Sequence, residues 1–246
     1  MGILVSICLS TYQRPQLLEN TLKSIQRQRL PFGCEVIVVD DDPNGSARLV
    51  CEQFNSVQYQ HISRPAGYRN PAIARNAAYR QASGRIIIAQ SDDVIHYSPN
   101  CIEELVHTLR PNTFVIATVV NTNQDGQVCC DPTGVGFGDR LSVYTSSQRR
   151  RPLFFLGCLW KDDLYAVGGN DEEFTAPSGE DRWFALCLTN GLKLTPIYSE
   201  DIVGRHQMHP HCDPATTVPS QNLLQRKTAL ARAGKIPWQA SGGSWL

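Results

Sequence analysis

The chain has 246 residues, with 23 basic and 23 acidic side chains, so its formal net charge at pH 7 is zero. A chain of this length can bury a substantial core, as one large domain or two small ones. The balanced charge excludes non-specific binding to nucleic acid, which needs a surplus of basic surface. No apolar run approaches the roughly 20 residues of a transmembrane helix.

The N-terminal residues and the cysteines indicate where the protein is found. Residues 1–6, MGILVS, formally match a myristoylation pattern, but residues 3–9 are typical of a core strand and no basic segment precedes them. We therefore expect neither acylation nor a signal peptide. The nine cysteines are odd in number and form no C-x-x-C pair, which argues against a disulfide framework. These features favour the cytoplasm, and the oligomeric state stays open.

Strand and helix patterns alternate along most of the chain. Apolar runs predict strands at 3–9, 35–39, 57–62, 85–89, 114–120, 153–160 and 194–198. Helical spacing or caps predict helices at about 15–29, 46–54, 70–83, 99–109, 162–167, 179–190 and 220–233. This order predicts an α/β fold with a doubly wound, mainly parallel sheet.

Two segments depart from this alternation. Residues 124–152 are rich in Gly, Asp, Ser and Arg and predict a loop-rich portion; its basic run Arg149-Arg150-Arg151 is either a solvated face or a guide for an anionic substrate. The Gly/Ser-rich residues 241–244 predict a poorly ordered tail.

An acidic pair follows the most apolar strand. The run Ile86-Ile87-Ile88-Ala89 leads through Gln90-Ser91 to Asp92 and Asp93. Ligands in open α/β sheets bind at the carboxyl ends of parallel strands. Hard divalent cations prefer oxygen ligands and are often bound by carboxylates and substrate phosphates together. The pair therefore suggests a metal-diphosphate site. The alternative is that these acids only cap the next helix.

Other strand ends carry polar residues that can meet the same crevice. These are Thr11, Tyr12 and Arg14 after the first strand, and Asp40 and Asp41 after the second. An aromatic ring there can stack on a base, a carboxylate can accept a hydrogen bond from the base, and Arg75 can meet phosphate.

Six segments in this order resemble the inverting glycosyltransferases of family 2, which have the GT-A fold. The segments are Val5-Ser6-Ile7 with Thr11-Tyr12-x-Arg14-Pro15; Glu35-Val36-Ile37-Val38-Val39-Asp40-Asp41; Ala74-Arg75-Asn76-Ala77-Ala78 with Gly84; Ser91-Asp92-Asp93; Val167-Gly168-Gly169-Asn170-Asp171-Glu172-Glu173-Phe174; and Gly179-Glu180-Asp181-Arg182-Trp183. The resemblance spans roughly residues 3–210. It implies transfer of a sugar from a nucleotide-sugar donor, with UDP favoured, to a glycan or other hydroxyl acceptor.

The resemblance also implies roles for individual residues. Thr11, Tyr12 and Asp41 hold the base, and Arg75 approaches the diphosphate. Asp93, with Asp92 nearby, holds Mn²⁺ or Mg²⁺, and His206 matches a late histidine that completes the metal site in some members. Arg14 belongs with the donor-binding residues. Asp181 is the catalytic base, and inversion needs only this base and the metal.

These roles divide the chain into three parts. Residues 1–120 would bind the nucleotide sugar, residues 121–210 would bind the acceptor and carry the base, and residues 211–246 would form a C-terminal helix and flexible tail. One departure from the family pattern is Gln90, where the acidic motif often begins with another carboxylate. Ion affinity without nucleotide is then expected to be low.

Alternative interpretations remain. A nucleotidyltransferase would also bind nucleotide and metal at strand ends, although it typically needs a Gly-rich phosphate loop that Ser10-Thr11-Tyr12 does not provide. A sugar-nucleotide or glycan-binding module without turnover is a second alternative, against which the presence of both Asp93 and Asp181 argues. A zinc site could use the compact cluster His206, His209, His211 and Cys212. We favour a single histidine contribution to the Mn²⁺ site over zinc.

Overall fold

The computed structural model describes residues 2–64, 70–123, 125–129, 143–146, 150–210 and 214–246. Its strands are β1 (Ile3–Thr11), β2 (Gly33–Asp40), β3 (Val57–His61), β4 (Ile86–Ser91), β5 (Val94–His96), β6 (Thr113–Thr122), β7 (Val143–Thr145), β8 (Leu156–Trp160) and β9 (Thr195–Gln207). Its helices are α1 (Pro15–Gln26), α2 (Arg48–Cys51), α3 (Pro71–Gln81), α4 (Cys101–Thr108), α5 (Lys161–Ala166), α6 (Glu180–Leu186) and α7 (Pro214–Arg232), and a π-helical turn (Cys187–Gly191) extends α6.

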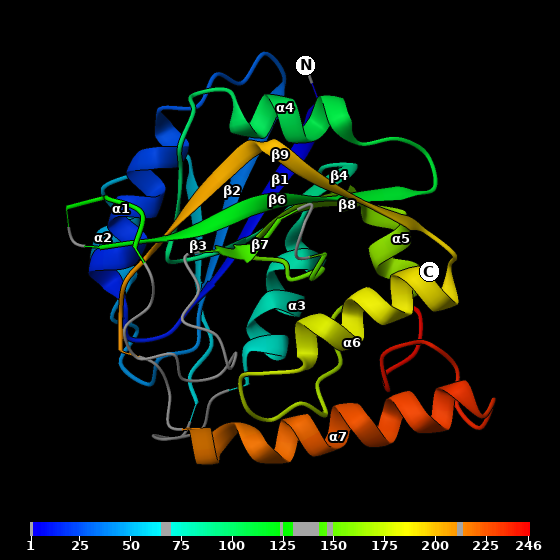
Figure 1. Cartoon of the computed structure of the whole chain (residues 1–246). Helices are drawn as coiled ribbons and strands as arrows, with labels where there is room; N and C mark the ends of the chain where they lie inside the picture. The colour runs from blue at the N-terminus through cyan, green and yellow to red at the C-terminus, as the bar shows by residue number, and fades with distance from the viewer. Residues whose placement is uncertain (1, 65–69, 124, 130–142, 147–149, 211–213) are drawn as a thin grey trace.

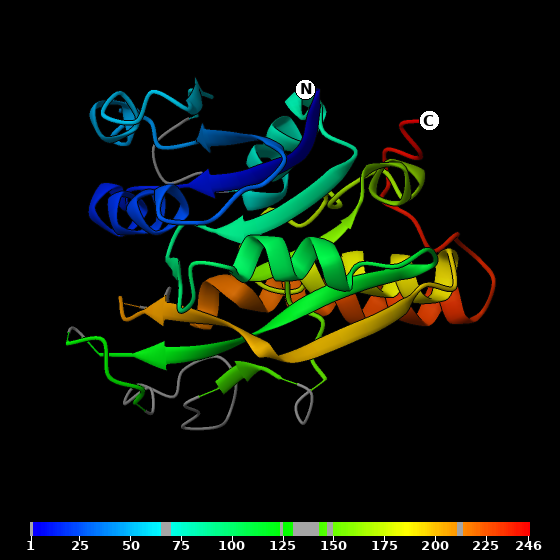
Figure 2. The same ribbon diagram turned by 90° about the horizontal axis from the view of Figure 1, so that it is seen from above.

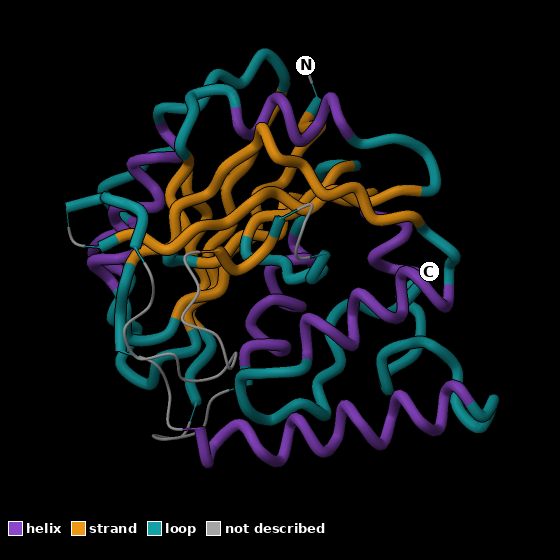
Figure 3. The backbone as a smooth tube through the Cα atoms, viewed as in Figure 1, coloured by secondary structure: helices purple, strands orange, loops and turns teal. Residues whose placement is uncertain are grey.

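All nine strands form one curled sheet, which Figures 1 and 3 show between helices. The strand order is β3-β2-β1-β4-β8-β6-β9-β5, with β7 paired to β6. Strands β1 to β4 pair in parallel, and so do β6 and β9, whereas β8 runs antiparallel to both of its neighbours. The predicted α/β fold with a mainly parallel, doubly wound sheet is confirmed.

Helices cover both faces of the sheet, as Figure 2 shows from above. Along β1 the side chains alternate between two cores because successive residues of a strand point to opposite faces. Val5, Ile7 and Leu9 pack with α1, α2 and α4, and Cys8 packs with α3. The apolar run of β1 is therefore a consequence of burial on both faces.

The order of the sheet places a crevice at the ends of β1 and β4. The chain runs from β1 outward to β2 and β3, and then returns through α3 to β4 on the other side of β1. Such a reversal leaves a gap at the carboxyl ends of the two central strands. Ser10 pairs with Ser91 at this edge, so Asp92 and Asp93 follow directly into the gap.

The last strand is much longer than the sequence predicts. Apolar periodicity indicates a strand only at 194–198, but β9 continues to Gln207 through the polar and largely exposed residues 199–201. Its pairing with β6 shifts register between Ile116 and Thr118, where the Thr118 hydroxyl donates to the carbonyl of Ser199 at 2.7 Å. Residues 195–198 and 203–207 pair with β6, and residues 204–206 also pair with β5, so the flanking segments hold this stretch at the sheet. Apolar patterning gives no sign of this pairing.

The C-terminal segment corrects two further expectations. Helix α7 begins at Pro214 and not near residue 220, and Pro219 is accommodated within it. The tail after α7 is packed onto the molecule: Trp245 N donates to the carbonyl of Tyr165 at 2.9 Å, and Ala240 N donates to that of Val167 at 2.9 Å. The tail that the Gly/Ser composition predicts to be poorly ordered is thus packed against the molecule through backbone hydrogen bonds and aromatic contacts.

The loop-rich portion 124–152 is only partly described. Within it, β7 pairs with β6, and the buried hydroxyl of Thr145 donates to the carbonyl of Ala117 at 2.8 Å. Arg149 lies outside the described residues. Among the helices of the described ranges, none has both the length and the apolar character needed to cross a bilayer.

Candidate active site

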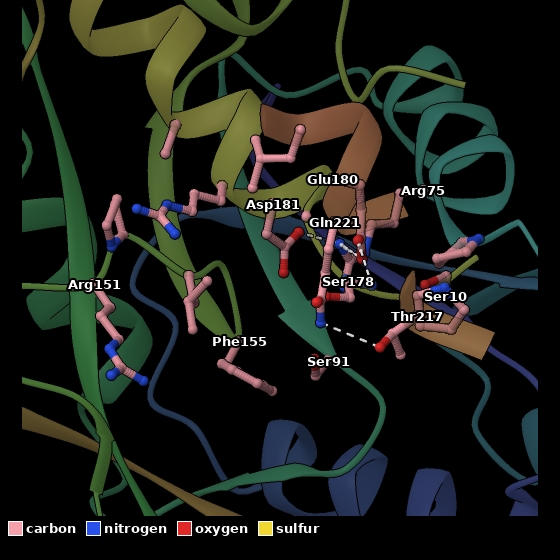
Figure 4. Close-up of a pocket in the computed structure, with 18 of the residues that line it drawn as sticks. Ser10, Arg75, Ser91, Arg151, Phe155, Ser178, Glu180, Asp181, Thr217 and Gln221 are labelled. Carbon is pink, nitrogen blue, oxygen red and sulfur yellow. Dashed lines mark hydrogen bonds and ion pairs between the residues drawn. The ribbon is translucent and has the colours of Figure 1, made fainter. Parts of the chain in front are cut away.

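A cavity of about 870 Å³ opens at the crevice between β1 and β4. Its lining comes from strand ends, from α3 and α6, from residues 150–155 that lead into β8, and from α7. Figure 4 shows part of this lining, including Asp181, Arg75 and Ser91. Of the residues predicted for the site, the cavity brings together the following: Arg14, Arg75, Asp92, Asp93, Asp181 and His206.

The register of β5 with β9 explains how a late histidine reaches an early aspartate. Val94 pairs with His206, so Asp93 lies beside the end of β9. His209 follows two residues after the strand and turns back to the same carboxylate. Single ligand atoms of Asp93, His206 and His209 all lie within 4.8 Å of one another. Within the part of the chain that the structure describes, these three side chains form a group that could hold a metal ion.

Hydrogen bonds orient both imidazoles toward Asp93. His206 Nδ1 lies 3.0 Å from Asn121 Oδ1, and His209 Nδ1 lies 2.8 Å from the carbonyl of Pro210. Because these oxygens accept, each Nδ1 carries a proton, and each Nε2 faces the Asp93 carboxylate, to which it donates when the ring is protonated; a neutral ring would offer a lone pair there instead. The two Nε2 atoms lie 3.5 and 3.1 Å from Asp93 Oδ2. One carboxylate oxygen and two imidazole nitrogens that converge in this way fit a cation, which would replace the protons on the two Nε2 atoms.

The Asp93 carboxylate is buried and has cationic neighbours. Burial alone would raise the pKa of Asp93, but the charge of His206, hydrogen bonds from both histidines and the Arg14 guanidinium hold the pKa well below its usual range. Arg14 Nη1 donates to Asp93 Oδ2 at 2.7 Å. Asp93 Oδ1 is buried and has no hydrogen-bond partner among the described residues. An unsatisfied buried carboxylate oxygen is what a missing ligand would leave.

The neighbouring acid, Asp92, is held by the first strand and helix. Thr11 Oγ1 donates to Asp92 Oδ2 at 2.7 Å, and Thr21 Oγ1 donates to the Asp92 carbonyl at 2.8 Å. The Thr11 hydroxyl thus fixes the acidic loop. The cap interpretation for the pair does not account for these contacts, because both carboxylates bond to side chains of other elements.

The predicted base, Asp181, lies in the first turn of α6. The Arg75 guanidinium on α3 forms an ion pair with Asp181, and its Nη1 is 3.5 Å from Glu180 Oε1. Arg75, which the sequence places near the diphosphate, therefore also fixes the orientation of the base. Helix α3 is itself fixed by its start, where the Asn70 side chain accepts from Ala72 N and Pro71 occupies the first turn.

Glu180 has an unusual environment beside Asp181. It is 5% exposed, and its Oε2 accepts from Ser178 N at 2.8 Å. Burial and the neighbouring Asp181 raise the pKa of Glu180 to about 7, against the lowering effect of Arg75. A carboxyl group that titrates near neutrality next to the cavity is a frequent property of active sites.

Helix α3 also secures the loop that precedes α6. Asn76 Nδ2 donates to the Asn170 carbonyl at 2.8 Å, and Asn76 Oδ1 accepts from Asn170 N at 2.8 Å. A side chain on Gly169 would have its Cβ 2.5 Å from Asn76 Oδ1, and the residue has φ of +68°. The motifs Ala74-Arg75-Asn76 and Gly168-Gly169-Asn170 are therefore one structural unit that sets the path to Asp181.

The residues expected to bind the nucleotide base lie apart from the cavity lining. Asp41 is 3% exposed and its N donates to the Thr11 carbonyl at 3.2 Å, so the ends of β1 and β2 are joined there. Asp40 accepts from Asp42 N and Ala47 N, which makes it a structural residue of the turn. The roles of Thr11, Tyr12 and Asp41 in base binding stay predictions.

The sequence names His209 only within the zinc alternative and indicates no role for Asn121. Both depend on long-range pairing: Asn121 pairs with His206 across β6 and β9. The H-x-x-H spacing of His206 and His209 is the sequence feature that indicates a paired metal site. With a strand predicted only to residue 198, however, nothing places these histidines next to Asp93. His211 and Cys212, the other members of the possible zinc cluster, lie outside the described residues.

Comparison with solved structures shows the fold class. The chain aligns with the mannosyltransferase PcManGT from Pyrobaculum calidifontis, in complex with GDP-Man and Mn²⁺, at 21% identity and a TM-score of 0.64 over 95% of this chain and 65% of that one. S. aureus TarS aligns at 16% identity and 0.63 over 93% and 39%. TarS 1-349 in complex with UDP-GlcNAc aligns at 15% and 0.61 over 87% and 61%. The chain thus spans less than two thirds of these proteins.

Sequence comparison gives two further results. No curated protein matches the chain. The model of Glycosyl transferase family 2 matches residues 6–151, which is more than half of the chain and includes most of the first strand, Arg75 and the acidic pair. The resemblance that these motifs indicate is therefore confirmed, and the chain belongs to glycosyl transferase family 2.

Proposed function

We propose that the protein is a metal-dependent, inverting glycosyltransferase that moves a hexose from a nucleotide sugar, UDP-sugar favoured, to a hydroxyl of a glycan. One observation carries this proposal. A single cavity contains the Asp93-His206-His209 group and the Arg75-Asp181 pair. A cation site and a carboxylate base within one cavity are the two parts that sugar transfer with inversion requires.

The ligand set supports Mn²⁺ over Mg²⁺. Two of the three donors are imidazole nitrogens. Mg²⁺ prefers an all-oxygen shell and retains its waters, whereas affinity for nitrogen ligands is higher for transition metals. When bound, the ion would neutralise the charge that develops on the departing diphosphate. Asp93, His206 and His209 would hold it, and Asn121 would keep His206 in the tautomer that can ligate.

The protein's own residues account for the proton and the geometry of attack. Asp181 accepts the proton of the acceptor hydroxyl as that oxygen forms its bond to the anomeric carbon. The bond to the nucleoside diphosphate breaks on the opposite face, and its electron pair leaves with the phosphate oxygen. Arg75, next to Asp181, orients the base. Attack from the face opposite the leaving group inverts the configuration in one step.

The family membership favours this function over its rivals. Residues 6–151 match a glycosyltransferase model, which removes the reason for considering a nucleotidyltransferase. A binding module without turnover would keep the metal group but would not need a base that is paired with Arg75. Hydrolysis of the donor in the absence of acceptor separates an enzyme from such a module.

We further assign Thr11, Tyr12 and Asp41 to binding of the nucleotide base. Arg14 and Asp92 are assigned to binding of the nucleotide-sugar donor. Residues 1–120 would form the nucleotide-sugar-binding half and residues 121–210 the half that binds the acceptor and carries the catalytic base. The C-terminal helix α7 adds one wall to the cavity. Free thiols are present at Cys8, Cys34, Cys51, Cys101, Cys158 and Cys187, which supports a reducing compartment such as the cytoplasm.

The replacement Asp181→Asn tests the role of the base. The amide keeps the shape and loses the basicity, so turnover should fall by roughly 10² to 10⁴ while donor affinity is retained. Product analysis by proton NMR should show β-linkage from an α-linked donor. An equal loss of donor affinity would make Asp181 a structural residue, and an α-linked product would refute single displacement.

A further inference from the structure

Helix α7 forms one wall of the cavity that contains Asp181. Thr217, Gln221, Leu224 and Gln225 line the cavity, and because Leu224 and Gln225 follow Gln221 by three and four residues, and Gln221 follows Thr217 by four, they share one face of the helix. Figure 4 shows Gln221 and Thr217 among the lining side chains, with a dashed line between them. This helix lies beyond residue 151, where the family match ends. Its role is therefore not assigned by that match.

Close packing fixes α7 against the residues that precede the base. Gly179 has φ of +93°, and a Cβ on it would lie 3.3 Å from the Ser220 carbonyl oxygen and 3.5 Å from Leu224 Cβ. The buried Ser220 hydroxyl donates to the Ala176 carbonyl at 3.0 Å. The face of α7 next to Ser220 is thus held against the N-terminal end of α6, whose first turn contains Asp181.

The cavity face of α7 carries no charged side chain and is polar except for Leu224, whereas the arginines of the cavity lining, Arg150, Arg151 and Arg182, come from other segments. Gln221 and Gln225 are exposed, and the Gln221 amide donates to Thr217 Oγ1 at 3.2 Å. The charged Lys227 points elsewhere, to Asp171 and Glu173 at 2.8 Å each. A primary amide offers two N–H donors and a carbonyl acceptor, which suits neighbouring hydroxyl groups that both donate and accept.

Other parts of the cavity lining supply apolar surface. Leu153 and Phe155 line the cavity from the segment that leads into β8 and are partly buried. A pyranose ring presents hydroxyls at its edge and C–H groups on its faces. Amides on one wall and an aromatic ring elsewhere in the same cavity therefore match its two kinds of surface.

We infer that Thr217, Gln221 and Gln225 form a subsite for an uncharged pyranose unit of the acceptor, beside the base. This inference rests on the proposed function, because it places the acceptor hydroxyl at Asp181. The helix outside the family match then determines which glycan the enzyme accepts. Donor binding, which depends on the strand ends and on the Asp93 group, does not depend on these glutamines.

The test uses the full chain with UDP and Mn²⁺ on an array of immobilised neutral and anionic oligosaccharides. The wild type should bind one or more neutral glycans. Gln221→Ala and Gln225→Ala should each weaken that binding by about 3- to 10-fold, the loss for one neutral hydrogen bond. The matched control is Asn222→Ala, an exposed residue on the same helix outside the cavity lining. The control should bind glycan as the wild type does.

Several outcomes would overturn the inference. They are absence of glycan binding by the wild type, binding confined to anionic glycans, unchanged binding by both glutamine variants, or an equal loss in Asn222→Ala. Calorimetry with UDP and Mn²⁺ is run on every variant and should give the wild-type affinity. If the wild type itself binds no sugar nucleotide, the proposed function fails. If it binds donor and the glutamine variants keep full glycan affinity, only the subsite is wrong.

Discussion

Single hydrogen bonds orient the two histidines of the metal group. His209 and His206 both direct Nε2 to Asp93, and the Pro210 carbonyl and Asn121 bond to their Nδ1 atoms. Position alone would leave His209 as an incidental neighbour. The convergence of its Nε2 with that of His206 on one carboxylate supports a role as ligand, because a cation there would contact all three side chains.

We therefore predict that His209→Ala weakens Mn²⁺ binding in the presence of UDP by at least tenfold, and that Asn121→Ala weakens it by roughly 10- to 100-fold through loss of the bond that orients His206. Calorimetric titration with Mn²⁺ measures both. His107→Ala, an exposed histidine of α4, serves as the control. If His209→Ala matches that control, His206 alone completes the site.

Glu180 links the site to the pH dependence of stability. Its pKa in the folded protein is about 7 and its ordinary value is 4.5, so the folded state holds the proton over this window and the unfolded state does not. The contribution of Glu180 to stability is therefore fully present below pH 4.5 and is lost as pH rises through 7.

Glu180→Gln should remove this dependence. Between pH 5 and pH 8, the free energy of unfolding of the wild type should fall relative to that of the variant by roughly 1 to 3 kcal/mol. Urea unfolding of both proteins across this range measures the difference. A difference that stays constant with pH would show that Glu180 titrates normally in the folded state.

At the scale of elements, the C-terminal segment supports the catalytic helix. Trp238 stacks on Trp183 of α6 with ring centroids 5.5 Å apart, and Trp245 packs edge-on against Tyr165 of α5 at 5.3 Å. The Arg80 guanidinium of α3 lies 4.1 Å from the ring centroid of Trp245. The tail thus connects the helices that carry Arg75 and Asp181.

Trp245→Ala should lower the free energy of unfolding by about 1 to 3 kcal/mol, because it removes an aromatic pair, a cation–π contact and partly buried apolar area. The adjacent Leu246 is 77% exposed, so Leu246→Ala should change it by less than about 0.5 kcal/mol. Thermal or urea unfolding compares the two. Equal effects would mean that the tail is not anchored by Trp245.

At the scale of the whole molecule, the sequence predicts what is local and misses what depends on pairing. The strand at 86–91 and its acids are apparent because burial on both faces leaves an apolar run that ends at the carboxylates. The first turn of α3 is apparent from Asn70-Pro71. The continuation of β9 to Gln207 is not, because residues 199–201 are polar and lie in an irregularity between two segments, 195–198 and 203–207, that pair with β6.

The candidate site divides in the same way. Asp93, His206, Arg75 and Asp181 come from local motifs, and the cavity brings all of them together. The ion pair of Arg75 with Asp181 and the participation of His209 arise between segments about 105 residues or more apart in the sequence. Apolar periodicity carries no information on such contacts, and the packing of the tail was missed for the same reason.

The central claim is that the cavity binds a nucleotide sugar through a metal held at Asp93. The most direct measurement is a thermal-shift panel of UDP, GDP and their sugars with Mn²⁺ or with EDTA, on the wild type and on Asp93→Asn. We predict that a UDP-sugar with Mn²⁺ stabilises the wild type, by about 2.7 kcal/mol at 100 times its dissociation constant. This stabilisation should vanish with EDTA and in the folded Asp93→Asn protein. Stabilisation that is unchanged by EDTA and by the replacement, or no stabilisation by any sugar nucleotide, would contradict the account.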